Sequence, residues 1–242
     1  MSSYVCDCID DLIPDLFNLH EDRLLGYGMH VLAFEYSRDK VFIVSKEYGK
    51  EKYLKNLRLN IEENIFPDYF SLELKKELLN LKSEFSYFVM DKLEEFDLYK
   101  TEKDSYIIDD YASPVISQVL RAISMYKSDS CLIPREFESV EELKKELPEI
   151  LEYYKILCNE EFDNLSEKQR ELDTMILKQA LYNYQTYSMK VLRAVKKSLN
   201  AVINSKIEGS FVLDLHSDQF MLHNGDIICI DPVMFNYEPV FM

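Results

Sequence analysis

The chain has 242 residues, of which 47% are hydrophobic, so it can bury a substantial core as one large domain or as two lobes. Its formal net charge of −16 disfavours direct contact with nucleic-acid phosphates, which proteins neutralise with lysine and arginine, and favours a basic protein partner. Five scattered cysteines, no signal peptide and no long apolar run predict a protein of a reducing cytoplasm without a membrane segment.

The first part of the chain predicts a small, mainly β unit. Residues 5–20 have the pattern of a short helix, and residues 24–46 that of two strands with a glycine-containing turn. Charge pairs and apolar residues at helical spacing predict a helix over residues 47–64, and a Phe-Pro-Asp breaker follows it at residues 66–68. Residues 85–93 then predict a buried strand that abruptly becomes charged.

Two glycines near the first strand could cover a nucleotide. Gly26 and Gly28 match the first half of a glycine-rich loop, in which missing side chains let backbone N–H groups approach phosphates. Val31 occupies the third glycine position of that motif. A plain structural turn is therefore the alternative interpretation of the pair.

The second part of the chain has helical patterns. Acidic residues are concentrated at residues 136–163, where ten aspartates and glutamates stand against three lysines. We interpret this segment as the solvated face of a helix, with a docking surface as the alternative. A capping box at residues 166–169 and the apolar stripe that follows it predict a long buried helix over residues 167–204.

The most informative stretch follows that helix. Asp214 and Gln219 stand five residues apart, the spacing at which kinase catalytic loops place an aspartate that orients the acceptor hydroxyl and an asparagine that holds magnesium. An Asn-Gly turn at residues 224–225 predicts a hairpin that delivers Asp231 beyond its second strand. The alternative is a surface hairpin that happens to be rich in polar residues.

Residues 213–235 resemble the early-gene serine/threonine protein kinases of T-seven-type bacteriophages, whose pattern is D-x-H-S-G-N-x-M, then N-G-D, then D-P-V-x-F. The matching positions are Asp214, His216, Ser217, Met221, Asn224, Gly225, Asp226, Asp231, Pro232, Val233 and Phe235. The resemblance implies an α+β, protein-kinase-like two-lobed fold that is truncated after the metal-binding strand. Its small N-lobe would be residues 1–90 and its helical C-lobe residues 91–242.

The same resemblance implies the roles of the site residues. Asp214 would be catalytic, and His216 either catalytic or a structural residue of the loop. ATP would lie under the glycine pair and near Lys46, and magnesium would be held by Gln219 and Asp231.

Three departures from the family pattern bear on activity. Gln219 replaces the metal-binding asparagine, and Asp218 replaces its neighbouring glycine. The strand lysine that binds nucleotide phosphates falls at Ile43, and side-chain alternation puts Lys46 on the opposite face unless a bulge intervenes. Only 11 residues follow Asp231, so we expect no substrate platform of the eukaryotic kind.

The sequence therefore leaves three functions open. The first is a phage-type kinase that phosphorylates host proteins in the host cytoplasm and so modulates transcription or defence. The second is a pseudokinase that binds and inhibits a host protein through its acidic surface. The third is an acidic mimic of DNA, which the interleaved lysines and arginines disfavour.

Overall fold

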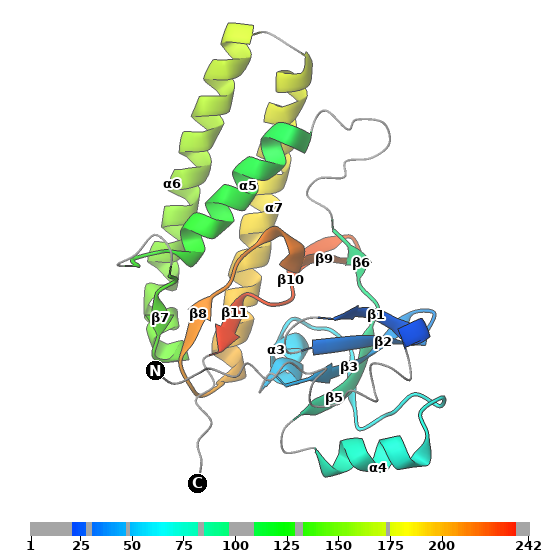
Figure 1. Cartoon of the computed structure of the whole chain (residues 1–242). Helices are drawn as coiled ribbons and strands as arrows, with labels where there is room; N and C mark the ends of the chain where they lie inside the picture. The colour runs from blue at the N-terminus through cyan, green and yellow to red at the C-terminus, as the bar shows by residue number, and fades with distance from the viewer. Residues whose placement is uncertain are drawn as a thin grey trace, which may run out of the picture. The chain divides into compact units, whose positions relative to one another are not determined.

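The computed structural model describes residues 21–27, 31–46, 49–81, 85–96, 109–128, 133–172 and 175–235. The α+β class is confirmed: a five-stranded antiparallel sheet is followed by helices and two small sheets (Figure 1). The chain forms two compact units, the first ending at Lys92 and the second beginning at Leu93. Their assignment as kinase lobes stays a prediction. The predicted helix at residues 5–20 and Gly28 lie outside the described residues.

The first unit is built on an antiparallel sheet in the order β1-β2-β3-β5-β4. A 3-10 turn, η1 (Glu21–Arg23), precedes it. The strands are β1 (Leu24–Tyr27), β2 (Val31–Ser37), β3 (Lys40–Ser45), β4 (Ile61–Glu63) and β5 (Ser86–Asp91), and the helices are α3 (Lys50–Asn56) and α4 (Leu72–Asn80). Residues 24–46 thus form three strands rather than the two predicted.

The helix predicted over residues 47–64 is confirmed only at Lys50–Asn56, and its second half is wrong. α3 ends at Asn56, and Arg58 takes a left-handed conformation with φ 69°, which stops the helix. Ile61–Glu63 instead pair with β5, where Ile61 lies opposite Met90. Main-chain pairing with a neighbouring strand outweighs the weak local preference of this segment for a helix.

Aromatic side chains fill the core of the first unit. Phe34 and Phe42 lie on the face of the sheet that packs against α4, and both pack edge-on against Phe70, with ring centroids 6.0 and 5.4 Å away. Leu74 and Leu78 of α4 complete this cluster. The side chains that alternate with Phe42 in β3, among them Ile43, lie on the other face.

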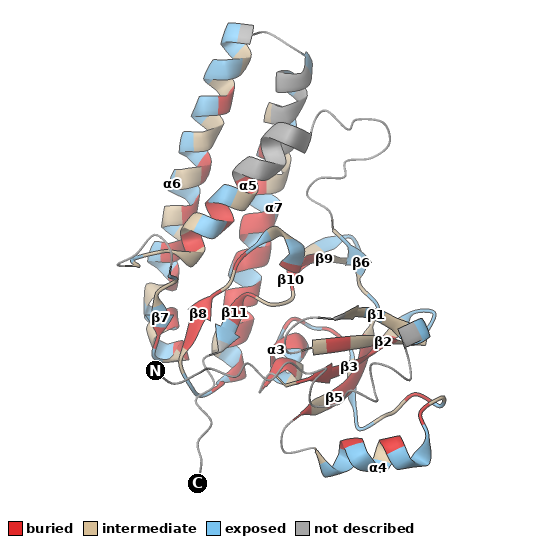
Figure 2. Cartoon of the chain, viewed as in Figure 1, coloured by how far each residue is buried: buried red, intermediate tan, exposed pale blue. Residues whose placement is uncertain are grey.

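Three helices dominate the second unit: α5 (Asp109–Ser124), α6 (Val140–Leu172) and α7 (Met175–Ser205). Figure 2 shows buried residues repeating along α6 and α7 with exposed residues between them. The helix predicted over residues 167–204 is wrong at its start, because residues 166–169 lie inside α6 and α7 begins only at Met175. The capping signal is overridden there by packing of the buried Leu165. In the described residues, no helix is both long and apolar enough to cross a lipid bilayer.

Buried tyrosines fasten α6 to α7. The Tyr154 hydroxyl of α6 donates a hydrogen bond to the Ser188 carbonyl, 3.1 Å away. The Tyr184 hydroxyl of α7 donates one to the Cys158 carbonyl, 2.9 Å away. Both tyrosines are about 1% exposed, so each hydroxyl satisfies its hydrogen bond inside the helical pair.

Two small antiparallel sheets complete the second unit. One has the order β10-β9-β6 and the other the order β11-β8-β7. Their strands are β6 (Glu94–Glu95), β7 (Glu136–Phe137), β8 (Phe211–Leu213), β9 (Phe220–His223), β10 (Asp226–Cys229) and β11 (Val233–Phe235). The predicted hairpin is confirmed: Asp226 pairs with His223 across a turn in which Asn224 and Gly225 have φ 53° and 81°.

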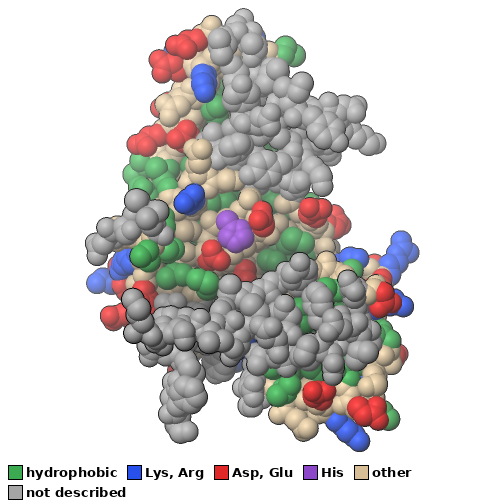
Figure 3. Space-filling model, viewed as in Figure 1, with side chains coloured by type: hydrophobic (Ala, Val, Ile, Leu, Met, Phe, Trp, Pro, Cys, Tyr) green, Lys and Arg blue, Asp and Glu red, His purple; other side chains and the backbone are tan. Residues whose placement is uncertain are grey.

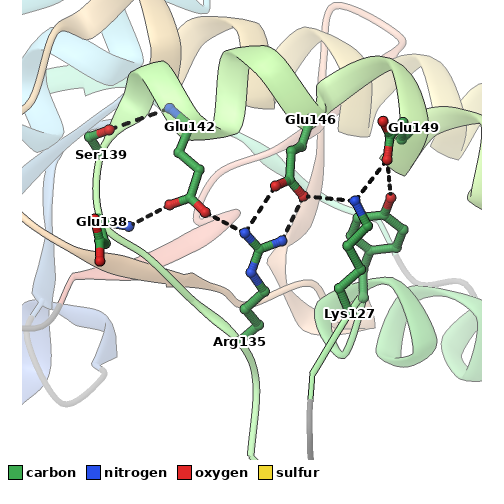
Figure 4. A network of polar contacts seen from close by, with 8 residues as sticks. Lys127, Arg135, Glu138, Ser139, Glu142, Glu146 and Glu149 are labelled. Carbon is green, nitrogen blue, oxygen red and sulfur yellow. Dashed lines mark hydrogen bonds and ion pairs between the residues drawn. The ribbon is translucent and has the colours of Figure 1, made fainter.

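An ion-pair network fixes the start of α6 (Figure 4). The Arg135 guanidinium donates to Glu146 at 2.6 and 2.9 Å and also binds Glu142. Lys127, just after α5, donates to Glu149 at 2.8 Å and lies 3.5 Å from Glu146. Most of the acidic segment of the sequence is therefore helical, and two cations pair with three glutamates in its first turns.

Replacing Gly225 by alanine should destabilise the protein by about 1–2 kcal/mol. Gly225 has φ 81°, and an added Cβ would meet no atom within 4 Å, so the cost is backbone strain alone. Urea unfolding measures it. Gly26→Ala is the matched control, because its Cβ also meets no atom but its φ lies outside the left-handed region. Equal effects at the two positions would contradict the strain argument.

Arg135→Met should lower the free energy of unfolding at pH 7 by about 2 kcal/mol. Hydrogen bonds from Arg135 hold the pKa of Glu146 below its ordinary 4.5. A lowered pKa stabilises the folded state above pH 4.5, and this contribution is lost as the pH falls below that value. Unfolding curves from pH 7 to pH 3 should therefore converge for the variant and the wild type. The exposed pair of Lys155 and Glu152 gives the control, since Lys155→Met should change little.

Candidate functional site

The loop between β8 and β9 carries the predicted catalytic residues, and main-chain bonds hold both of its ends. The Asp214 N–H donates to the Pro232 carbonyl at 3.0 Å, one residue beyond the pairing of Leu213 with Val233. At the other end, the Ile230 N–H donates to the Gln219 carbonyl at 2.8 Å. Asp231 lies between these two contacts. The structure thus brings the backbones of Asp214, Gln219 and Asp231 together.

The side chains of Asp214 and Gln219 contact each other directly. The Gln219 Nε2 donates to the Asp214 Oδ2 at 3.0 Å. Gln219 is only 6% exposed, and its Oε1 is buried without a hydrogen-bond partner. A buried acceptor left unpaired costs about 1–3 kcal/mol, which a cation or another ligand could offset. The structure therefore holds an amide oxygen free to bind beside a half-exposed carboxylate.

His216 lies beside two carboxylates without bonding to either. Its Nε2 is 3.9 Å from the Asp214 Oδ2, and its Nδ1 is 3.9 Å from the Asp218 Oδ2. Both distances exceed a hydrogen bond, so neither ring nitrogen of His216 bonds to these carboxylates. Acidic side chains gather beside a histidine on the face drawn in Figure 3. The His216 carbonyl accepts the Gln219 N–H at 3.2 Å, which gives this residue a structural role in the loop.

Two helical serines support the loop, and both were missed in the sequence. The Ser124 Oγ at the end of α5 accepts the N–H of Leu215 at 2.8 Å. The Ser198 hydroxyl of α7 donates to the Cys229 carbonyl at 3.0 Å. Ser198 is fully buried in an otherwise apolar stripe, which was the available signal, because a buried hydroxyl needs a partner. Ser124 carried no such signal.

The predicted nucleotide-binding residues of the first unit lie in or directly after strands of its sheet. Gly26 lies in β1 beside a register irregularity, and the space where its Cβ would stand is open. Lys46 directly follows β3, which pairs with β5 without a register shift up to Ser45. No bulge thus moves Lys46 to the face of Ile43. Lys40 is held by Glu62 in an ion pair.

The first turn of α3 holds charged residues that the sequence did not single out. Lys50 is 9% exposed and follows Gly49, whose φ is 80°. Glu51 has a buried Oε2 without a hydrogen-bond partner. A buried carboxylate oxygen without a hydrogen-bond partner is costly, so Glu51 is a further candidate for contact with a charged ligand.

No family model, curated protein or solved structure matches this chain. Among the residues that the structure describes, no group of three or more His, Cys, Asp or Glu side chains is arranged to hold a metal ion. The site is therefore described by its own geometry alone.

Ser124→Ala should loosen the Asp214 loop, because the Leu215 N–H loses its acceptor. We expect a loss of about 1–2 kcal/mol in unfolding free energy and faster amide exchange at Leu215. Hydrogen exchange followed by NMR measures both effects. Ser217→Ala is the matched control in the same loop, because the Ser217 hydroxyl donates only to its neighbour Asp218. Unchanged exchange at Leu215 in Ser124→Ala would refute the supporting role.

Proposed function

We propose that the protein is a kinase-like phosphotransferase that moves the terminal phosphoryl group of ATP to a serine or threonine hydroxyl of a host protein. The catalytic residue would be Asp214, with Gln219 and Asp231 as the magnesium-binding pair. The T-seven-type phage kinase pattern at residues 213–235 supplies the reaction class and the kind of substrate. Modulation of host transcription or defence would follow from that substrate.

The observation that carries the proposal is the hydrogen bond from Gln219 to Asp214 together with the unpaired Gln219 Oε1. The Gln219 amide nitrogen orients the Asp214 carboxylate, so the amide oxygen is left as a buried ligand atom for a cation. Oxygen ligands from carboxylates and amides are those that magnesium accepts. Residues of these types would therefore suit the ion that phosphoryl transfer needs.

Each residue would have a defined task. The Asp214 carboxylate, 43% exposed, can accept a hydrogen bond from the acceptor hydroxyl and take its proton as the oxygen bonds to phosphorus. Asp231 and the Gln219 Oε1 would hold magnesium, which when bound neutralises charge on the phosphates. Main-chain bonds on either side of Asp231 preserve the spacing between the two tasks.

The first unit would bind the nucleotide. Protein kinases pair a strand lysine with a glutamate on a helix, and α3, which follows β3, carries Glu51 with a buried, unpaired oxygen. Open space at Gly26 would let backbone N–H groups approach phosphates, with Gly28 beside it in sequence. The buried Lys50 is the candidate phosphate-binding lysine, and Lys46 would take this role only if its side chain reached the face of Ile43.

A pseudokinase is the second candidate, and the register of β3 favours it. Ile43 occupies the place of the phosphate-binding lysine, and the unbroken pairing of β3 with β5 leaves no bulge to exchange the faces. In this case the site would be a binding surface for a host protein. Retention of both aspartates and of the Gln219 contact makes us prefer the active enzyme.

Variants of three aspartates should separate binding from chemistry. We expect Asp231→Asn to abolish magnesium-dependent ATP binding, because a carboxylate ligand is lost. Asp214→Asn should retain ATP binding and lose roughly 100-fold or more in phosphate transfer, because the acceptor for the hydroxyl proton is lost. Calorimetry measures binding, and radiolabelled phosphate incorporation into host proteins or the chain itself measures transfer.

Asp218→Asn is the matched control, since Asp218 lies in the same loop with its side chain 86% exposed. It should match the wild type in both assays. Magnesium-dependent ATP binding without phosphate transfer by the wild type would favour a pseudokinase. An absence of ATP binding at millimolar concentration would reject the kinase and leave a protein that acts by binding a host protein.

A further inference from the structure

The α6 and α7 helices each expose one continuous stripe of side chains. We call them the α6 stripe and the α7 stripe, and every member is exposed. The α6 stripe is Glu149, Glu152, Ile156, Glu160, Asp163 and Glu167. The α7 stripe is Lys178, Tyr182, Gln185, Met189, Arg193 and Lys196. Because successive members are three or four residues apart, each stripe lies along one face of its helix.

The two stripes have opposite charge. The α6 stripe contains five carboxylates around a single isoleucine, Ile156, which is 46% exposed. Two of the five also pair within the chain, Glu149 with Lys127 and Glu152 with Lys155. The α7 stripe contains three cations and no carboxylate, and residues 175–205 as a whole contain no aspartate or glutamate. It also exposes Tyr182 at 62% and Met189 at 47%. In a chain of net charge −16, a helix of purely positive charge is a local exception.

The spacings of the stripes match when the helices run antiparallel. From Lys178 the α7 stripe advances by four, three, four, four and three residues, and from Glu167 the α6 stripe descends by the same steps. Placing Met189 opposite Ile156 therefore sets Arg193 opposite Glu152. The same register sets Lys178 opposite Glu167, Lys196 opposite Glu149 and Tyr182 opposite Asp163. Apolar contact at the centre with charge pairs on both sides is the pattern of paired helices.

The two stripes of one chain cannot satisfy each other. Within the chain, α6 and α7 already contact through other faces, where Tyr154 bonds to Ser188 and Tyr184 bonds to Cys158. Along the helix axes, those bonds align α6 and α7 of one chain in nearly the register that would pair the two stripes. Glu152 and Ile156 lie two residues on either side of Tyr154, so the α6 stripe faces away from α7, and the α7 stripe likewise faces away from α6.

We propose that the α7 stripe of one copy packs antiparallel on the α6 stripe of a second copy of this chain. The contact is held by the Met189–Ile156 pair and by charge complementarity. The contact joins two different surfaces that face away from each other, so it is heterologous and leaves one stripe of each kind open for a further copy. Much of the attraction is between exposed charges, so self-association weakens as salt rises. This inference does not depend on phosphoryl transfer.

A charge exchange tests the register. Arg193→Glu and Glu152→Arg each place like charges opposite one another, so each should weaken self-association at least about tenfold. The double variant Arg193→Glu with Glu152→Arg restores opposite charges and should regain wild-type self-association. Sedimentation equilibrium at low and high salt measures it, and circular dichroism checks that each variant is folded. Lys144→Glu, an exposed α6 position outside both stripes, is the matched control and should leave self-association unchanged.

A cross-link tests the central contact directly. A mixture of Ile156→Cys and Met189→Cys proteins should form a disulfide-linked dimer on mild oxidation. Either variant alone should cross-link no more than the wild type, which accounts for the five native cysteines. A monomer at every concentration up to roughly 300 µM would overturn the proposal. So would a double variant that fails to recover, or a mixture that cross-links no better than its components.

Discussion

Main-chain pairing of residues 230–232 with the two ends of the Asp214 loop is the constraint on which the site depends. Ile230 bonds to Gln219, and Pro232 bonds to Asp214, so Asp231 cannot move far from either residue while these bonds persist. Side chains then add the finer geometry, because the Gln219 amide turns one carboxylate oxygen of Asp214 toward itself. A rigid backbone frame with a small number of polar side chains is the usual construction of a precise site.

Local signals in the sequence predicted correctly those features that only neighbouring residues determine. The hairpin was predicted correctly, because Asn224 and Gly225 alone determine a tight turn. β4 was mistaken for helix, because its strand identity comes from β5, more than twenty residues away. The start of the last helix was misplaced for a similar reason: polar residues that could cap a helix lie inside α6, whose continuity is decided by packing.

The candidate site was predictable only in part. Spacing identified Asp214, Gln219 and Asp231, but it could not reveal that Gln219 is buried with one amide oxygen unpaired. Ser124 and Leu215 are 91 residues apart in sequence, so nothing local links them. The sequence also could not show whether a bulge in β3 would change the face on which Lys46 lies. The absence of a bulge is a property of the pairing of β3 with β5.

The long sequence separations around the loop also shape how the second unit folds. α6 and α7 are neighbours in sequence and can pair early, whereas the loop needs α5, α7 and β11 in place at once. Non-local closure of this kind is slow compared with helix pairing. On a ribosome, the Asp214 amide has no acceptor until Pro232 has been synthesised and has left the exit tunnel. Ordering of the loop therefore depends on residues 230–232, which are synthesised after the loop itself.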